Sequence, residues 1–188
     1  AARLADEYKV VYLVAENFRY STDMVQARQW VAEGAIGEPL LARWSVIRAY
    51  DPQGKYVQTK WRQQPAHPGG YLTDAGVHYM DVLHAILGPA QQAQGFVSAH
   101  YPILGAEDTA VMNFRMAGDA PAHITMCFAG TESVNMLEVF GSAGAVRLIN
   151  DAYEGMAVPI LNHPNWRGGV STADMLPVKG LRLMEIFN

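Results

Sequence analysis

The sequence has a single cysteine, Cys127, among its 188 residues, so no disulfide can form within the chain. This cysteine usage is typical of proteins in a reducing compartment, and we expect a cytoplasmic protein. No run of Lys or Arg occurs, and the formal net charge is −4, which argues against nucleic acid or an anionic membrane surface as the partner. The apolar runs are far too short to cross a bilayer.

The sequence also lacks a Gly-x-Gly-x-x-Gly run, so the chain carries no dinucleotide-binding fingerprint of its own. No Cys or His pair has the spacing of a zinc site, and we predict no metal site. Hydrophobic residues make up 50% of the chain, which is enough to form a core. The length suits one main domain.

The two ends of the sequence look like pieces of larger elements. Residues 1–8 have the pattern of the last turns of a helix, and residues 9–15 (KVVYLVA) that of a buried strand. A short apolar strand after a helix is typical of a parallel sheet covered on both faces, so we interpret this segment as the end of a preceding α/β unit. Residues 181–188 resemble the start of a helix without a stop signal.

Between these ends, the pattern predicts helices first and strands afterwards. We expect a helix from Ser21 or Thr22 to about residue 34, a strand over 38–48, a long loop over 51–70 and a second helix over 73–87. From residue 91 the apolar residues alternate, and short turns separate the predicted strands. The fold class predicted is therefore α+β, with a large, mostly antiparallel open sheet and helices on one face.

The start of the second helix is the densest candidate site. Asp74 and His78 are four residues apart, so their side chains project from the same face of the helix. A carboxylate there can accept a hydrogen bond from one imidazole nitrogen and leave the other to exchange a proton with a hydroxyl group. Alternatively, Asp74 is a helix cap and His78 a packed side chain. Asp81 and His84 share the spacing, which leaves a divalent metal site as a further alternative.

Two other segments carry candidate ligand-binding residues. Trp61 and Arg62 stand side by side in the predicted loop, where a planar cation beside an indole can stack on a ring or bind phosphate and hydroxyl oxygens. The same pair can equally be exposed without a role. Asn17 follows the predicted strand 9–15, and residues just beyond such a strand line the ligand crevice of an open α/β sheet.

Several stretches together resemble the Gfo/Idh/MocA family of oxidoreductases (glucose–fructose oxidoreductase, inositol dehydrogenase and relatives). The matching segments occur in the order of the family and are AENFRY (15–20), EGAIGEP (33–39), WRQQPAHPGGYLTDAGVHYMDVLHAILG (61–88), ED (107–108) and LEVFGSAGAVRL (137–148). One such segment would be weak evidence, but five in order are specific.

The resemblance implies an N-terminal Rossmann domain that binds NAD or NADP, followed by an α+β domain with the substrate pocket. Residues 1–15 would then be the remnant of the dinucleotide-binding domain. Residues 16–188 would form the substrate-binding and oligomerisation domain, truncated at its C-terminus. The catalytic residues implied are His78 and Asp74, together with a lysine of a Glu-Lys-Pro motif expected upstream of Ala1. Asn17, Trp61 and Arg62 correspond to residues that contact the cofactor in some relatives.

The function expected of the full-length parent is hydride transfer between nicotinamide and a hydroxyl-bearing carbon of a sugar, polyol or related compound, and the fragment alone is expected to be inactive. The alternative is a non-catalytic substrate-binding or dimerisation module of the same fold. In this family the open sheet commonly packs against another subunit, so a homodimer or homotetramer is expected.

Overall fold

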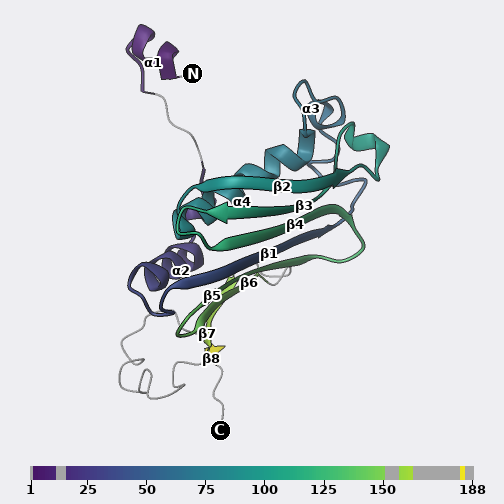
Figure 1. The fold of residues 1–188 in the computed structure, drawn as a ribbon. Helices are drawn as coiled ribbons and strands as arrows, with labels where there is room; N and C mark the ends of the chain where they lie inside the picture. Colours follow the sequence, from purple (N-terminus) through teal and green to yellow (C-terminus); the bar gives the residue numbers. More distant parts are fainter. Residues whose placement is uncertain (1, 12–15, 151–156, 163–182, 185–188) are drawn as a thin grey trace.

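The computed structural model describes residues 2–11, 16–150, 157–162 and 183–184 (Figure 1). The elements along the chain are α1 (Ala2–Tyr8), η1 (Phe18–Tyr20), α2 (Thr22–Ala32), β1 (Pro39–Ala49), α3 (Lys60–Gln63), α4 (Gly70–Leu87), β2 (Ala90–Ser98), η2 (Pro102–Leu104), β3 (Thr109–Met116), β4 (Pro121–Gly130), β5 (Val134–Gly141), β6 (Ala145–Asn150), β7 (Ala157–Asn162) and β8 (Leu183–Met184).

The described strands form one eight-stranded sheet in the order β2-β3-β4-β1-β5-β6-β7-β8. Two neighbouring pairs, β1 with β4 and β7 with β8, are parallel, and the other five are antiparallel. The prediction of an α+β fold with a large, mostly antiparallel sheet is confirmed. β1, the first of the described strands in sequence, lies in the middle of the sheet, between β4 and β5, which short-turn connections alone do not predict.

Alternation along the strands separates the two faces of the sheet. Ala42, Trp44 and Val46 of β1 are buried on one face, and β3, β4, β5 and β6 contribute to the same core. Helix α4 packs against β3 and β4 on this face, and α2 packs against β6 and β7 (Figure 1). This burial of side chains at every second strand position against two amphipathic helices is the main apolar stabilisation of the domain.

The opposite face, which we call the open face, carries rows of side chains that run across the strands. One row joins six residues in register, one from each of β2, β3, β4, β1, β5 and β6: Phe96, Val111, Thr125, Ser45, Met136 and Ile149. The neighbouring row is polar and consists of Gln94, Asn113, His123, Arg43, Glu138 and Arg147. None of the described helices covers this face (Figure 1).

Helix α4 starts earlier than its apolar pattern predicts. Its first residue is Gly70, preceded by Gly69 at a φ of 79°, where glycine avoids the steric cost of the left-handed region. Gly70 is buried, and a Cβ there would lie 2.8 Å from Cβ of Ala106. The helix ends at Gly88, as predicted. The pair of glycines thus lets the loop turn sharply into the helix that carries Asp74 and His78.

Three predictions at the ends and in the loop need correction. Lys9 to Val11 do not form a strand, because no described strand pairs with them, and residues 12–15 lie outside the described residues. Leu183 and Met184 form strand β8 on β7 rather than a helix, because β7 offers an unpaired edge; the rest of 181–188 lies outside the described residues. The loop 51–70 contains the short helix α3. None of the described helices is long and apolar enough to cross a bilayer.

Candidate functional site

On the face of α4 that carries the predicted catalytic residues, each polar side chain contacts a different partner. Asp74, His78 and Asp81 lie on successive turns of one helical face, as their spacing predicts. Their partners come from the two segments beside α4, the loop with α3 and the segment that contains η1. The site is therefore formed by one helix and two short segments that are distant from it in sequence.

Asp74 accepts hydrogen bonds from Arg62, not from His78. Its Oδ2 atom lies 2.9 Å from Nε and 2.6 Å from Nη2 of Arg62, and the Arg62 side chain is 11% exposed. A third nitrogen, Nη1, donates to Oγ1 of Thr59 at 3.0 Å. The expected orientation of His78 by Asp74 is thus not the contact observed, because Oδ2 of Asp74 accepts both hydrogen bonds from Arg62 and the imidazole is bonded elsewhere.

His78 instead contacts Glu16, which precedes η1. The distance between Nδ1 of His78 and Oε2 of Glu16 is 2.7 Å, and both side chains are partly buried. Phe18 stacks on the imidazole with ring centroids 4.5 Å apart and an interplanar angle of 23°. Among the described residues, no hydrogen bond reaches Nε2 of His78, and the side chain as a whole is 28% exposed.

Three aromatic side chains lie around the guanidinium of Arg62. Its guanidinium lies 3.9 Å from the ring of Trp61, 5.0 Å from that of Tyr56 and 5.5 Å from that of Tyr71. Burial raises the pKa of the Tyr71 phenol, although the nearby charge of Arg62 acts in the opposite direction. Trp61 and Tyr56 remain about half exposed. The predicted Trp61–Arg62 pair is thus a stacked pair with one exposed aromatic surface.

Asn17 is exposed and precedes η1, where its carbonyl oxygen accepts a hydrogen bond from the Tyr20 amide. Its side chain makes no hydrogen bond to Trp61 or Arg62 in the described part of the chain. The structure therefore places Asn17 beside the segment that contacts His78, and Trp61 and Arg62 beside Asp74. The cofactor roles of these three residues stay predictions.

The alternative of a metal site on α4 finds no support in the geometry. Asp81 binds Arg19 through two contacts of 2.6 Å, and Nε2 of His84 accepts a hydrogen bond from the Ala90 amide at 3.3 Å. Within the described ranges, no three His, Cys, Asp or Glu side chains are close enough to share a metal ion. These side chains therefore form separate contacts rather than one ligand set.

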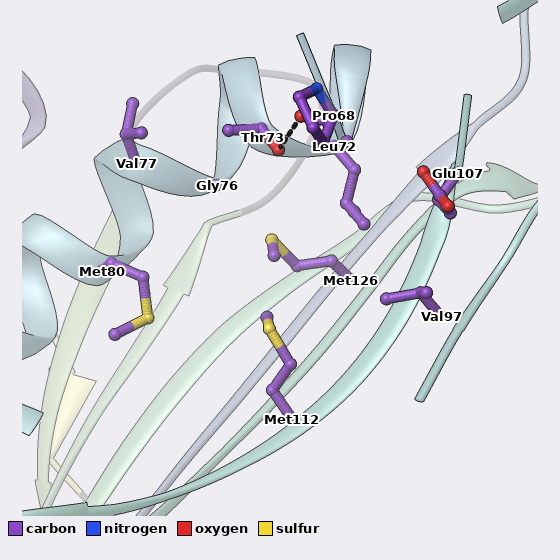
Figure 2. A pocket seen from close by; sticks show the side chains of 11 residues that line it. Pro68, Leu72, Thr73, Gly76, Val77, Met80, Val97, Glu107, Met112 and Met126 are labelled. Atoms are coloured by element: carbon purple, nitrogen blue, oxygen red, sulfur yellow. Dashed lines mark hydrogen bonds between the residues drawn. The ribbon is translucent and has the colours of Figure 1, made fainter. Parts of the chain in front are cut away.

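A hollow of about 500 Å³ lies beside another face of α4 (Figure 2). Side chains from the helix and from β2, β3 and β4 line it, and most of them are apolar: Leu72, Val77, Met80, Val97, Met112 and Met126. Thr73, whose hydroxyl donates to the carbonyl of Pro68 at 3.2 Å, and Glu107 add polar atoms (Figure 2). Asp74 and His78 do not line this hollow, so it is distinct from the candidate site.

Sequence reasoning missed Glu16 as a site residue. It lies 62 residues before His78, and no spacing rule relates residues so far apart. The available signal was its position directly beyond the predicted strand 9–15, which drew attention to Asn17 instead. The position of Glu16 next to Asn17 was therefore the only local indication of its role in the sequence.

A family model described as the GFO/IDH/MocA C-terminal domain matches residues 24–147 of the chain. The D-apiose dehydrogenase of Rhizobium rhizogenes is 25% identical over 154 residues, which cover 78% of this chain and 42% of that enzyme. A crystal structure of an oxidoreductase from Thermotoga maritima is similar with a TM-score of 0.74 and 29% identity, and the match covers 84% of this chain and 49% of that one.

The WlbA dehydrogenase from Bordetella pertussis, crystallised with NADH and UDP-GlcNAcA, has a TM-score of 0.71 to this chain. Its identity is 22%, with 82% of this chain and 47% of that one covered, so this likeness concerns the fold alone. The chain spans less than half the length of each of these three proteins.

Proposed function

The chain belongs to the GFO/IDH/MocA C-terminal domain family, and we propose that it is the substrate-side domain of a nicotinamide-dependent oxidoreductase that acts on a hydroxyl-bearing carbon of a sugar, polyol or related compound. The observation that carries the proposal is His78, held at Nδ1 and available at Nε2 on the helix that matches the motif of the family. The sugar-like substrate is supported by the D-apiose dehydrogenase named among the relatives.

His78 is the proton-exchanging group in this proposal. When a substrate hydroxyl is oxidised, its O–H bond breaks and the proton moves to Nε2 of His78, while the C–H bond breaks with both electrons and a carbonyl forms. A nicotinamide bound beside this site would supply the hydride acceptor for oxidation and, in its reduced form, the hydride donor for the reverse reaction. In this proposal Asp74 has an indirect role. It holds the guanidinium of Arg62, and this guanidinium stacks on the ring of Trp61 and positions it beside the site.

The residues of this chain fit a subsidiary contact with a dinucleotide rather than its main site. The exposed ring of Trp61 and the exposed amide of Asn17 are suited to contact a planar base, a ribose or an amide group. Arg62 is mostly committed to Asp74, so its role would be to hold Trp61 in place. Which of NAD and NADP is used depends on residues outside this chain.

The single cysteine supports a reducing, cytoplasmic location.

The open face supports a proposed homodimer or homotetramer. Phe96 and Ile149, at the two ends of the row that also contains Val111 and Met136, are 85% and 38% exposed. Four of the six side chains in this row are apolar (Phe96, Val111, Met136 and Ile149), and association with a second copy would bury them.

The test of the function uses the protein that carries this chain together with its nucleotide-binding domain. Formation of NADH or NADPH is followed with a panel of polyols and aldoses, and we expect His78→Ala to lower turnover roughly 10²–10⁴-fold. The matched control is His84→Ala, the same change on the same helix, which we expect to keep turnover. Unchanged turnover in the His78 variant would overturn the assignment.

A non-catalytic module of the same fold is the second candidate. It predicts no oxidation of any compound in the panel, even when a fluorescence titration shows that NADH or NADPH binds. The partner of His78 bears on this alternative, because an imidazole that is hydrogen-bonded to a carboxylate at one nitrogen is suited to proton exchange at the other.

A further inference from the structure

The segment that contains Glu16 lies along α4 and contacts it at three consecutive points. Glu16 meets His78, Phe18 meets both His78 and Tyr79, and Arg19 meets Asp81. The Arg19–Asp81 contact is bidentate, with both N···O distances at 2.6 Å, and it joins η1 to the helix one turn beyond His78. Two anchors therefore fix the segment immediately after Glu16, which limits the positions that its carboxylate can adopt.

The imidazole of His78 is held on two sides by this segment. The Phe18 ring covers one face of the imidazole, and Glu16 lies in reach of its Nδ1 edge. Phe18 is itself in edge contact with Tyr79, a buried core residue, at a centroid distance of 5.7 Å. Stacking fixes the plane of the ring, and the carboxylate distinguishes one nitrogen from the other.

From these contacts we infer that Glu16, rather than Asp74, is the positioning residue for His78 in the proposed reaction. This inference rests on the proposed function and changes the expected pairing. Asp74 is occupied by Arg62, and the only carboxylate in contact with His78 among the described residues is that of Glu16.

The chemistry of the contact defines the proton on His78. A carboxylate only accepts hydrogen bonds, so the nitrogen that faces Glu16 carries a hydrogen. In the neutral imidazole the lone pair is then on Nε2, which is the nitrogen without a described partner. This tautomer is the one that can accept a hydroxyl proton at Nε2 during oxidation and return it during reduction.

The first test measures the tautomer of His78 without any reaction. Long-range ¹H–¹⁵N spectra of the isotope-labelled chain distinguish a hydrogen on Nδ1 from one on Nε2. We expect the Nδ1–H form for the wild type and for Glu16→Gln, because the amide oxygen still accepts the bond. Glu16→Ala should move the population towards Nε2–H. An unchanged tautomer in Glu16→Ala, with the spectrum of a folded protein, overturns the inference whatever the activity.

The second test measures turnover in the protein with its nucleotide-binding domain, using the polyol or aldose that it oxidises fastest. We expect Glu16→Ala to lower kcat about 10–100-fold with little change in KM, part of what a general base contributes. Glu16→Gln should recover most of the loss. Glu33→Ala, the same change at an exposed site on the neighbouring segment, should have no effect on kcat or on the tautomer of His78.

The two tests separate this inference from the proposed function. If Glu16→Ala shifts the tautomer but keeps kcat, Glu16 does not position His78 for catalysis, and the oxidoreductase assignment stands. If His78→Ala itself keeps full turnover, the proposed role of His78 fails, and the inference fails with it. A tautomer shift together with a loss of kcat that Gln reverses supports both.

Discussion

At the scale of single residues, Glu138 is a buried carboxylate on the polar row of the open face. It is 2% exposed, and its oxygens accept hydrogen bonds from Nε of Arg43 and, at 2.7 Å, from Nε of Arg147. Burial on its own would raise the pKa of Glu138, but the hydrogen bonds and charges of the two arginines hold it below its ordinary value. The carboxylate is therefore ionised in the folded protein at neutral pH.

The sign of this shift predicts how stability depends on pH. Because the folded pKa is lower than the unfolded one, Glu138 stabilises the fold above the unfolded value of about 4.3, and this contribution is lost as the pH falls through the folded pKa. We expect Glu138→Gln to lower the free energy of unfolding at pH 7 by about 1–3 kcal/mol. Below pH ~5 the difference from the wild type should shrink.

Urea denaturation at pH 7, 5, 4 and 3 checks this prediction. Glu132→Gln is the control, since Glu132 is exposed in the turn before β5 and should follow the wild type at every pH. A difference between Glu138→Gln and the wild type that stays constant down to pH 3 would contradict the linkage argument.

At the scale of elements, α4 contains a glycine at a position where its backbone does not require one. Gly76 is buried in the middle of the helix, and a Cβ there would lie 3.2 Å from Cε of Met126. Cε is the end of a flexible side chain that lines the hollow beside α4, so it has room to move (Figure 2). Gly70 differs, since its φ is 38° and its neighbours are less able to yield.

We therefore expect Gly76→Ala to stabilise the protein by about 0.5–1 kcal/mol, because alanine has the higher helix propensity. Gly70→Ala should destabilise it, because a Cβ at Gly70 would meet Ala106 at 2.8 Å in a backbone conformation that favours glycine. Urea midpoints of the two variants give the comparison. Destabilisation by Gly76→Ala would mean that Met126 cannot move into the hollow.

At the scale of the whole molecule, the open face is the surface through which we propose that copies of the protein associate. Val111 is 37% exposed near the centre of β3, beside Phe96 in register. If copies of the protein associate through this face, Val111→Asp introduces a carboxylate that must be buried without a partner. We expect sedimentation velocity to show the dimer or tetramer for the wild type and the monomer for this variant.

The control for association is Val77→Asp, the same change at a valine that is 44% exposed on the helix side of the sheet. It should leave the oligomer intact. Dissociation by Val77→Asp but not by Val111→Asp would place the interface on the helix side instead.

The sequence was sufficient for features that depend on local pattern. Alternation and helical spacing predicted α2, β1, α4, β3 and β4, and the spacing of Asp74 and His78 placed both on one face of α4. Motifs in order identified the family, which the match over residues 24–147 confirms. These features depend on neighbours within a few residues, where periodicity and turn chemistry act.

Tertiary structure decided which distant residues meet. β1 inserts between β4 and β5, β8 pairs with β7, and Glu16 contacts His78, all between segments well separated in the chain. Arg62 and Asp74 are only 12 residues apart, but they lie on different elements that the fold brings together. Spacing rules relate residues within an element, whereas a carboxylate pairs with whichever cation or donor the packed fold brings within about 3 Å. Composition and pattern therefore determined the elements and the family, and packing determined the partner of each catalytic candidate.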